Sequence, residues 1–161
     1  MSTGSDLATR AELFGSVFVL VGHLTTRMDR ELRELDLTTR QWLLLAVLDR
    51  LGRERPPTLT EAAAAYGSSR QNVKAIAEGL AARGWLHIQR DARDRRAVRL
   101  TLTDRIDVFH QPDQERRAAD LLGEVYSGLP PSDVTDLHRL VIDWLAALAG
   151  RDSAPALVIK E

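Results

Sequence analysis

The chain has 161 residues, no cysteine and a formal net charge of −1, with 22 lysines and arginines against 23 aspartates and glutamates. This length and a 44% hydrophobic content fit one soluble domain with a buried core. The lack of cysteine excludes disulfides, thiolate metal sites, cysteine nucleophiles and thiol redox sensing. No apolar run approaches 18 residues and the N-terminus has no export signal, so we expect a cytoplasmic protein without a membrane partner.

The first predicted element is a long amphipathic helix over residues 8–35. Its apolar side chains recur every three or four residues, at Leu13, Val17, Leu20, Leu24, Met28, Leu32 and Leu35. Phe14, Phe18 and Val21 widen this apolar stripe beyond what one neighbouring helix would cover. A helix that is apolar on more than one side predicts burial against a second subunit.

Three shorter helices are predicted next. A Ser or Thr followed three residues later by Glu or Gln indicates helix starts at residues 38, 58 and 68. These helices are expected to end near Gly52, at Tyr66 and before Gly84. Residues 66–69 join the second and third of them, which is the pattern of a helix-turn-helix.

A hairpin and two further helices complete the predicted order. Residues 86–89 and 98–102 alternate apolar and polar side chains, which predicts two strands with a charged connector between them. A helix is expected from Thr103 to Gly128, with Pro112 as a kink or a restart. A last helix follows the prolines at 130 and 131, and residues 150–161 are expected to be a frayed tail.

Charge is distributed unevenly along the chain. Residues 1–65 carry 8 basic and 9 acidic side chains, residues 66–105 carry 9 and 4, and residues 106–161 carry 5 and 10. A basic middle segment in a neutral or acidic scaffold indicates a polyanion-binding element. On charge alone, an ordinary solvated helix face is an equally good interpretation.

The predicted helix from residue 68 has side chains that suit a DNA major groove. Arginine can pair with guanine, and glutamine or asparagine with adenine, while hydroxyls at a helix N-terminus and a lysine one turn later can meet phosphates. The candidate base readers are Arg70, Gln71 and Asn72, and the candidate phosphate contacts are Ser68, Ser69 and Lys74. A solvated polar face is the alternative interpretation of this helix.

The connector between the strands has the composition of a wing tip. Its four arginines are Arg90, Arg93, Arg95 and Arg96. An arginine at such a tip can enter the minor groove, and Arg93 and Arg95 are the candidates for this contact. Two aspartates, at positions 91 and 94, are expected to brace an arginine, with Arg96 as the intramolecular partner. The alternative is a solvent-facing hairpin whose charge only prevents edge aggregation.

These residues resemble the MarR (multiple antibiotic resistance regulator) family of bacterial winged-helix transcription factors. The resemblance covers residues 59–61, 69–73, 80–84 and 91–103, and its most specific part is the D-x-R-D-x-R wing followed by a strand that ends in Leu-Thr. It implies a mainly α-helical fold with a small β-hairpin wing. It also implies a homodimer formed by residues 8–35 and 104–149, a winged helix-turn-helix over residues 36–103 and a tail over 150–161.

The function that the resemblance implies is sequence-specific binding of double-stranded DNA. The chain would regulate transcription as a dimer on pseudo-palindromic operators. The resemblance further implies a repressor that a small molecule, such as a phenolic or lipophilic acid, releases from DNA. The pocket for that effector would lie among Phe18, Trp42 and the start of the helix after the wing.

Two other classes of function are weighed against this one. A winged-helix scaffold for dimerisation or protein contact would be favoured by a wing or helix without positive charge, which this sequence does not show. An enzyme is not expected, because no catalytic triad, phosphate loop or dinucleotide motif occurs. We expect no cofactor and no metal site, since the four histidines are far apart in the sequence.

Overall fold

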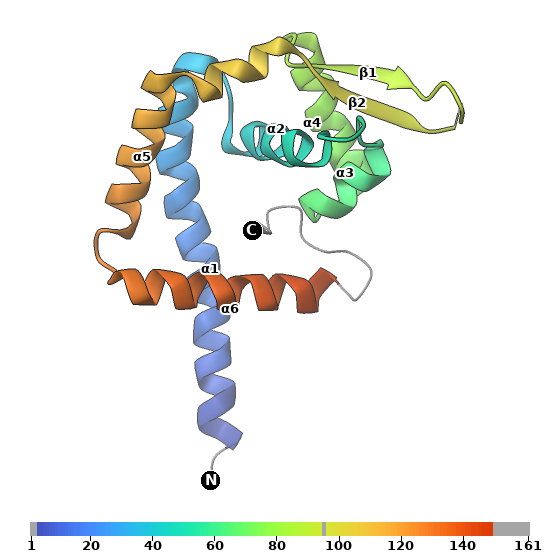
Figure 1. The fold of residues 1–161 in the computed structure, drawn as a ribbon. Helices are drawn as coiled ribbons and strands as arrows, with labels where there is room; N and C mark the ends of the chain where they lie inside the picture. Colours follow the sequence, from blue (N-terminus) through green and yellow to red (C-terminus); the bar gives the residue numbers. More distant parts are fainter. Residues whose placement is uncertain (1–2, 95, 150–161) are drawn as a thin grey trace. The chain divides into compact units, whose positions relative to one another are not determined.

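The computed structural model describes residues 3–94 and 96–149, and the predicted tail over residues 150–161 lies outside them. Its elements in chain order are α1 (Thr3–Glu31), η1 (Leu32–Leu35), α2 (Thr39–Leu51), α3 (Leu59–Tyr66), α4 (Arg70–Ala82), β1 (Leu86–Arg90), β2 (Val98–Leu102), η2 (Asp104–His110), α5 (Pro112–Tyr126) and α6 (Pro131–Ala149) (Figure 1). The predicted fold class, mainly α-helical with one hairpin, is confirmed. The chain divides into two compact units, Met1–Thr39 and Arg40–Glu161.

The first unit consists mainly of the long helix α1. The last turn of the predicted helix tightens into the 3₁₀ helix η1, and Asp36 ends it with a left-handed φ of 53°. The hydroxyl and the backbone N–H of Thr39 both donate to Asp29 Oδ1 at 2.7 Å, which holds the end of this unit. Apolar side chains of α1 are widely exposed, among them Phe14 at 60% and Phe18 at 64%.

By length and composition alone, the segment 6–35 could cross a membrane. Buried helices of water-soluble proteins pass the same test. Only the 14 residues from 13 to 26 form a run without Asp, Glu, Lys or Arg, whereas a span needs about 20 predominantly apolar residues. The composition of α1 therefore favours packing against protein over crossing a bilayer.

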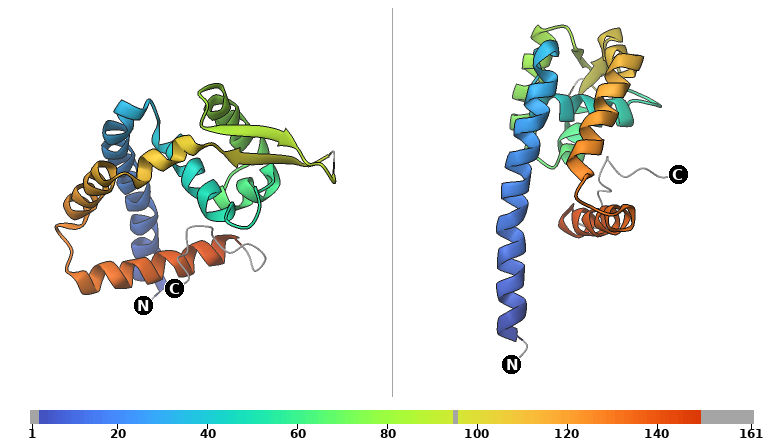
Figure 2. Two further views of the ribbon diagram at one scale, coloured as in Figure 1. Left: turned by 45° about the horizontal axis from the view of Figure 1, so that its top comes forward. Right: turned by 90° about the vertical axis from the view of Figure 1, so that its left-hand side faces the viewer.

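The core of the second unit lies between α2, α3, α4 and the hairpin. Its buried apolar side chains are Leu44, Leu45, Val47, Leu48, Leu59, Ala62, Ala63, Val73, Ala77, Leu80, Trp85, Leu86 and Leu100. The antiparallel strands pair Leu86 with Leu102 and Arg90 with Val98. Leu100 also donates its N–H to Pro57 O at 2.9 Å, which ties β2 to the loop before α3. Figure 2 shows the free end of the hairpin extending beyond these helices.

The helix starts in this unit follow from local side-chain caps. Thr58 and Glu61 form the predicted capping box of α3, and Gly67 ends this helix with a left-handed φ of 73°. The predicted start of α4 is wrong by one residue, because Ser69, and not Ser68, is the N-cap and accepts the N–H of Asn72. The hydroxyl of Ser68 is used elsewhere, as described below.

Trp85, which directly precedes β1 of the hairpin, is 1% exposed. Its ring lies 5.8 Å from that of Phe109, and the guanidinium of Arg105 lies over it at 4.3 Å. Residues 104–110 form a 3₁₀ helix where an α-helix was expected, and Pro112 begins α5 in its first turn, so the predicted restart is confirmed. Neither α5 nor α6 has a buried residue.

Candidate nucleic-acid interface

Helix α4 is amphipathic in the way that a groove-binding helix requires. Its inward face buries Val73, Ala77 and Leu80 in the core of the unit. On its N-terminal turns the candidate DNA contacts Ser69, Arg70, Gln71 and Lys74 are exposed. Lys74 Nζ lies 3.4 Å from Glu78 Oε1 in a solvent-exposed pair, which is the weak kind of ion pair that a phosphate can displace.

Asn72, by contrast, is half-buried and bonded within the protein. Its Oδ1 accepts a hydrogen bond from Arg40 Nη2 at 2.7 Å, and its Nδ2 donates to Ser68 Oγ at 2.8 Å. Arg40 is 32 positions earlier in the chain, on the first turn of α2. Sequence reasoning missed Arg40, because no local pattern connects it with α4.

The base of the wing is organised around Asp91, whose side chain is 9% exposed. Asp91 Oδ1 accepts the backbone N–H groups of Arg93 at 2.7 Å and Asp94 at 3.0 Å, and Oδ2 accepts Nε of Arg99. These backbone donors, followed by the Arg99 guanidinium, lower the pKa of Asp91 to about 2. The carboxylate is therefore charged at every physiological pH and fixes the turn of the wing.

The arginine that the wing aspartates were expected to hold is a different one. Arg99 on β2, and not Arg96, is the side-chain partner of Asp91, and its Nη1 also donates to Pro56 O at 2.6 Å. Arg96 contributes only its backbone N–H, which donates to Asp94 Oδ1 at 2.9 Å. Arg99 belongs to a strand whose register points it at the loop before α3, which the order of charges along the wing does not reveal.

Three of the other wing arginines face solvent. Arg90, Arg93 and Arg96 are exposed, while the predicted contact Arg95 lies outside the described residues. Because Asp91 is paired with Arg99, it does not neutralise the exposed arginines, and their positive charge can attract an external anion.

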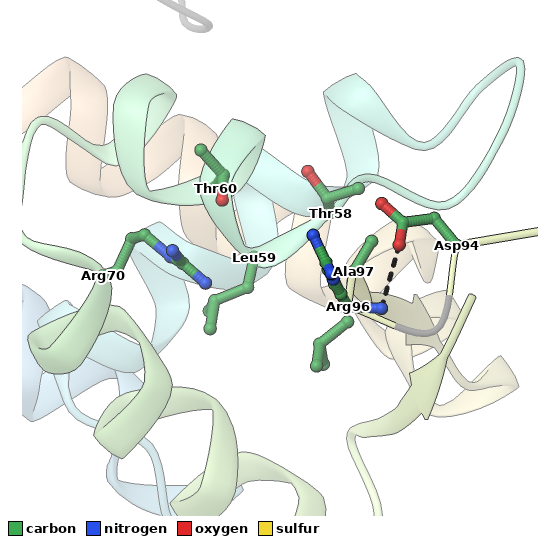
Figure 3. Close-up of a pocket in the computed structure, with 8 residues that line it drawn as sticks. Thr58, Leu59, Thr60, Arg70, Asp94, Arg96 and Ala97 are labelled. Carbon is green, nitrogen blue, oxygen red and sulfur yellow. Dashed lines mark hydrogen bonds between the residues drawn. The ribbon is translucent and has the colours of Figure 1, made fainter.

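Arg70 and Arg96 come from different elements and line the same shallow hollow (Figure 3). The hollow has a volume of about 200 Å³ and is lined by Thr58, Leu59, Thr60, Arg70, Asp94, Arg96, Ala97 and Val98. Two guanidinium groups and two threonine hydroxyls line it as hydrogen-bond donors, and the Asp94 carboxylate lines it as an acceptor. The two guanidinium groups suit a phosphate oxygen. The hollow brings one predicted residue of α4 and one of the wing together.

The predicted effector pocket involves residues of both units. Phe18 is exposed on α1, and Trp42 is half-buried on α2, so this site stays a prediction of the sequence. Within residues 3–94 and 96–149, no cluster of three or more histidines and carboxylates could hold a metal ion.

Comparison with known proteins gives the same fold. The family model that matches the chain is described as the MarR family and covers residues 35–97. A search among curated protein sequences finds no match. Wild-type MarR from E. coli in its apo form is similar at 19% identity, with a TM-score of 0.64 over 83% of this chain and 96% of that one.

Two further solved structures are similar over most of their length. Transcriptional regulator PA3341 is 28% identical, with a TM-score of 0.64 over 84% of this chain and 97% of that one. The structure of reduced AbfR bound to DNA is 18% identical, with a TM-score of 0.64 over 91% of this chain and 99% of that one. The matched segment contains α2, α3, α4 and the first strand of the wing. The chain thus matches the MarR family model over residues 35–97 and shares the fold of these solved regulators over most of its length.

Proposed function

We propose that this protein is a transcription regulator that binds pseudo-palindromic double-stranded DNA as a homodimer. The observation that carries the proposal is that Arg70 on α4 and Arg96 on the wing line one hollow. Gln71 and Lys74 on α4 and Arg93 on the wing are exposed as well. A recognition helix and a wing with these side chains can contact a major groove and the neighbouring backbone together.

Electrostatics supports an anionic partner for this surface. Residues 90–99 contain five arginines and two aspartates, and one of those aspartates is committed to Arg99. The excess positive charge is therefore concentrated on the exposed side of the hairpin.

A homodimer is supported by the apolar side chains that a single chain leaves exposed. Phe18 on α1 and Leu145 on α6 are 64% and 40% exposed. A second copy that covers such faces would also supply a second recognition helix, and the two would read half-sites about 34–36 Å apart. AbfR, a structure with the same fold, is bound to DNA.

Repression relieved by a small phenolic or lipophilic acid is the form of regulation that the family resemblance implies, and we include it in the proposal. The proposal also includes a cytoplasmic location and no enzymatic activity. The competing function, a winged-helix scaffold without specific DNA binding, predicts an uncharged wing, and the exposed Arg90, Arg93 and Arg96 disfavour it.

The test is binding to duplex DNA from the region upstream of the protein's own gene, with salt titration. Arg93→Ala should weaken binding by about 5-fold per protomer at 0.15 M salt and reduce the log–log salt slope by about 0.9 per lost phosphate contact. Arg116→Ala, which removes an exposed arginine of α5 that is paired with Asp113, is the matched control and should bind like the parent.

Other outcomes would contradict parts of the proposal. An Arg93→Ala variant with the parent's affinity and salt slope would show that the wing assignment is wrong. A Gln71→Ala variant with unchanged base preference would remove Gln71 from the base readers. A parent protein that binds no duplex more tightly than mixed-sequence DNA would favour the scaffold.

A further inference from the structure

The hydrogen bonds of Asn72 link α2 to the recognition helix α4. Its amide oxygen accepts from Arg40 Nη2 at 2.7 Å, its amide nitrogen donates to Ser68 Oγ at 2.8 Å, and its backbone N–H donates to Ser69 Oγ at 3.2 Å. Reading an adenine would need both amide atoms at once. In this structure both atoms are engaged within the protein, so base reading would compete with these two hydrogen bonds.

Arg40 differs from Arg55 and Arg99 in the charge of its partner. Arg55 is held by the carboxylate of Glu61, and Arg99 by the carboxylate of Asp91, so each of these pairs is close to neutral. The carboxamide of Asn72 can orient a guanidinium but carries no charge to cancel it. Arg40 is exposed, and the bond to Asn72 uses one of the five N–H donors of its guanidinium.

The backbone of Arg40 is held in place as well. Tyr66, the last residue of α3, donates its hydroxyl to Arg40 O at 3.2 Å. The guanidinium is therefore held against Asn72 in the first turn of α4, the turn that also carries the exposed Arg70 and Gln71. A charge placed there adds to the positive face that the proposed function assigns to DNA, although Arg40 lies outside the basic segment 66–105.

We propose that Arg40 binds a DNA phosphate and that Asn72 is a positioning residue that orients Arg40 without reading a base. This inference rests on the proposed function and extends it to the start of α2. It assigns to Asn72 a structural reason for being an amide: an aspartate would hold Arg40 equally well but would cancel the charge that the phosphate needs.

The experiment measures binding to a 30-base-pair duplex that the parent protein selects from a random pool, with the unselected pool as the non-specific probe. Arg40→Gln should weaken binding to both probes by about 5-fold per protomer at 0.15 M salt and lower the salt slope by about 0.9 per protomer. Its base preference should equal that of the parent. Arg40→Lys keeps the charge and should retain the parent's slope, and Arg116→Gln on α5 is the matched control.

Asn72→Ala distinguishes positioning from base reading. If Asn72 acts through Arg40, Asn72→Ala lowers the affinity for both probes without changing base preference. The double variant Asn72→Ala with Arg40→Gln then binds no more weakly than Arg40→Gln alone. A changed preference at one base pair would overturn the positioning role. If Arg40→Gln has the same salt slope as the parent protein, the phosphate contact is wrong and the proposed function still stands. If the parent protein binds neither probe, both the phosphate contact and the proposed function are wrong.

Discussion

Residues 40–103, here called the winged-helix segment, bury their apolar side chains within one chain, whereas helices α1, α5 and α6 expose theirs. Among the described residues, 13 of the 15 buried apolar side chains lie between Leu44 and Leu100. Of the 18 large apolar side chains that are exposed, 17 lie on α1, α5 or α6 or at Leu129, and Ile88 is the exception. The winged-helix segment thus has a complete core, while the helices need a partner surface to complete theirs.

This difference separates two contributions to stability. The winged-helix segment should have a stability that does not depend on protein concentration. The stability of the helices should depend on protein concentration, because the proposed dimer would bury their apolar side chains by association. Mutations can therefore be assigned to one contribution or the other.

The largest effect is expected in the core of the winged-helix segment. Leu80, on α4, is 0% exposed, and Leu80→Ala should lower the free energy of unfolding by about 2–5 kcal/mol at any protein concentration. Leu140→Ala, on α6, removes a side chain that is 54% exposed in one chain, and its cost should fall as the protein is diluted. Urea unfolding at two protein concentrations measures both. A Leu140→Ala cost that is the same at both concentrations would contradict the separation.

A somewhat smaller effect is expected at the exposed face of α6. Leu145→Glu places a carboxylate on a face that the proposed dimer buries, and we expect association to weaken by about 100-fold, or about 3 kcal/mol. Analytical ultracentrifugation would show a monomer at micromolar concentration. Asp136→Ala, on the same helix, is the control and should leave the dimer intact. A parent protein that is itself monomeric would refute the proposed dimer.

The smallest effect is expected at the wing. The pKa of Asp91 is lowered to about 2 from an ordinary 3.8, so the carboxylate stabilises the fold above about pH 4 and this contribution is lost as the pH falls toward 2. Asp91→Asn should unfold at lower urea than the parent at pH 7, and the difference should shrink between pH 4 and pH 2. Asp120→Asn, an exposed change on α5, is the control. If the difference in urea midpoint between the parent and Asp91→Asn grows as the pH falls, the Asp91 carboxylate does not stabilise the turn of the wing.

Features that depend on neighbouring residues were predicted well from the sequence. The capping box of Thr58 and Glu61 and the restart of the helix at Pro112 were both confirmed, because a cap and a missing N–H act within a few residues. The cap of α4 was placed one residue early. Ser68 and Ser69 are both suitable, and in the structure Ser69 accepts the backbone N–H of Asn72 while Ser68 accepts its side-chain amide.

Features that depend on distant segments were not predicted. The partner of Asp91 is Arg99, eight residues away across the hairpin, because strand pairing decides which arginine reaches the carboxylate. The hydrogen bond between Arg40 and Asn72 forms only if packing brings the first turn of α2 next to the first turn of α4. Residue types sufficed to predict a basic surface, but the packing of the helices determines which of its arginines are neutralised.

The burial of Trp85 gives the protein a natural spectroscopic probe. This indole is 1% exposed beneath the Arg105 guanidinium, so its fluorescence should shift to the red when the winged-helix segment unfolds. Trp144 on α6 is 38% exposed in a single chain and should shift to the blue when a second copy covers it. The third tryptophan is Trp42. Variants that retain only Trp85 or only Trp144 of the three would let the folding of the segment and the assembly of the helices be followed separately, without an added label.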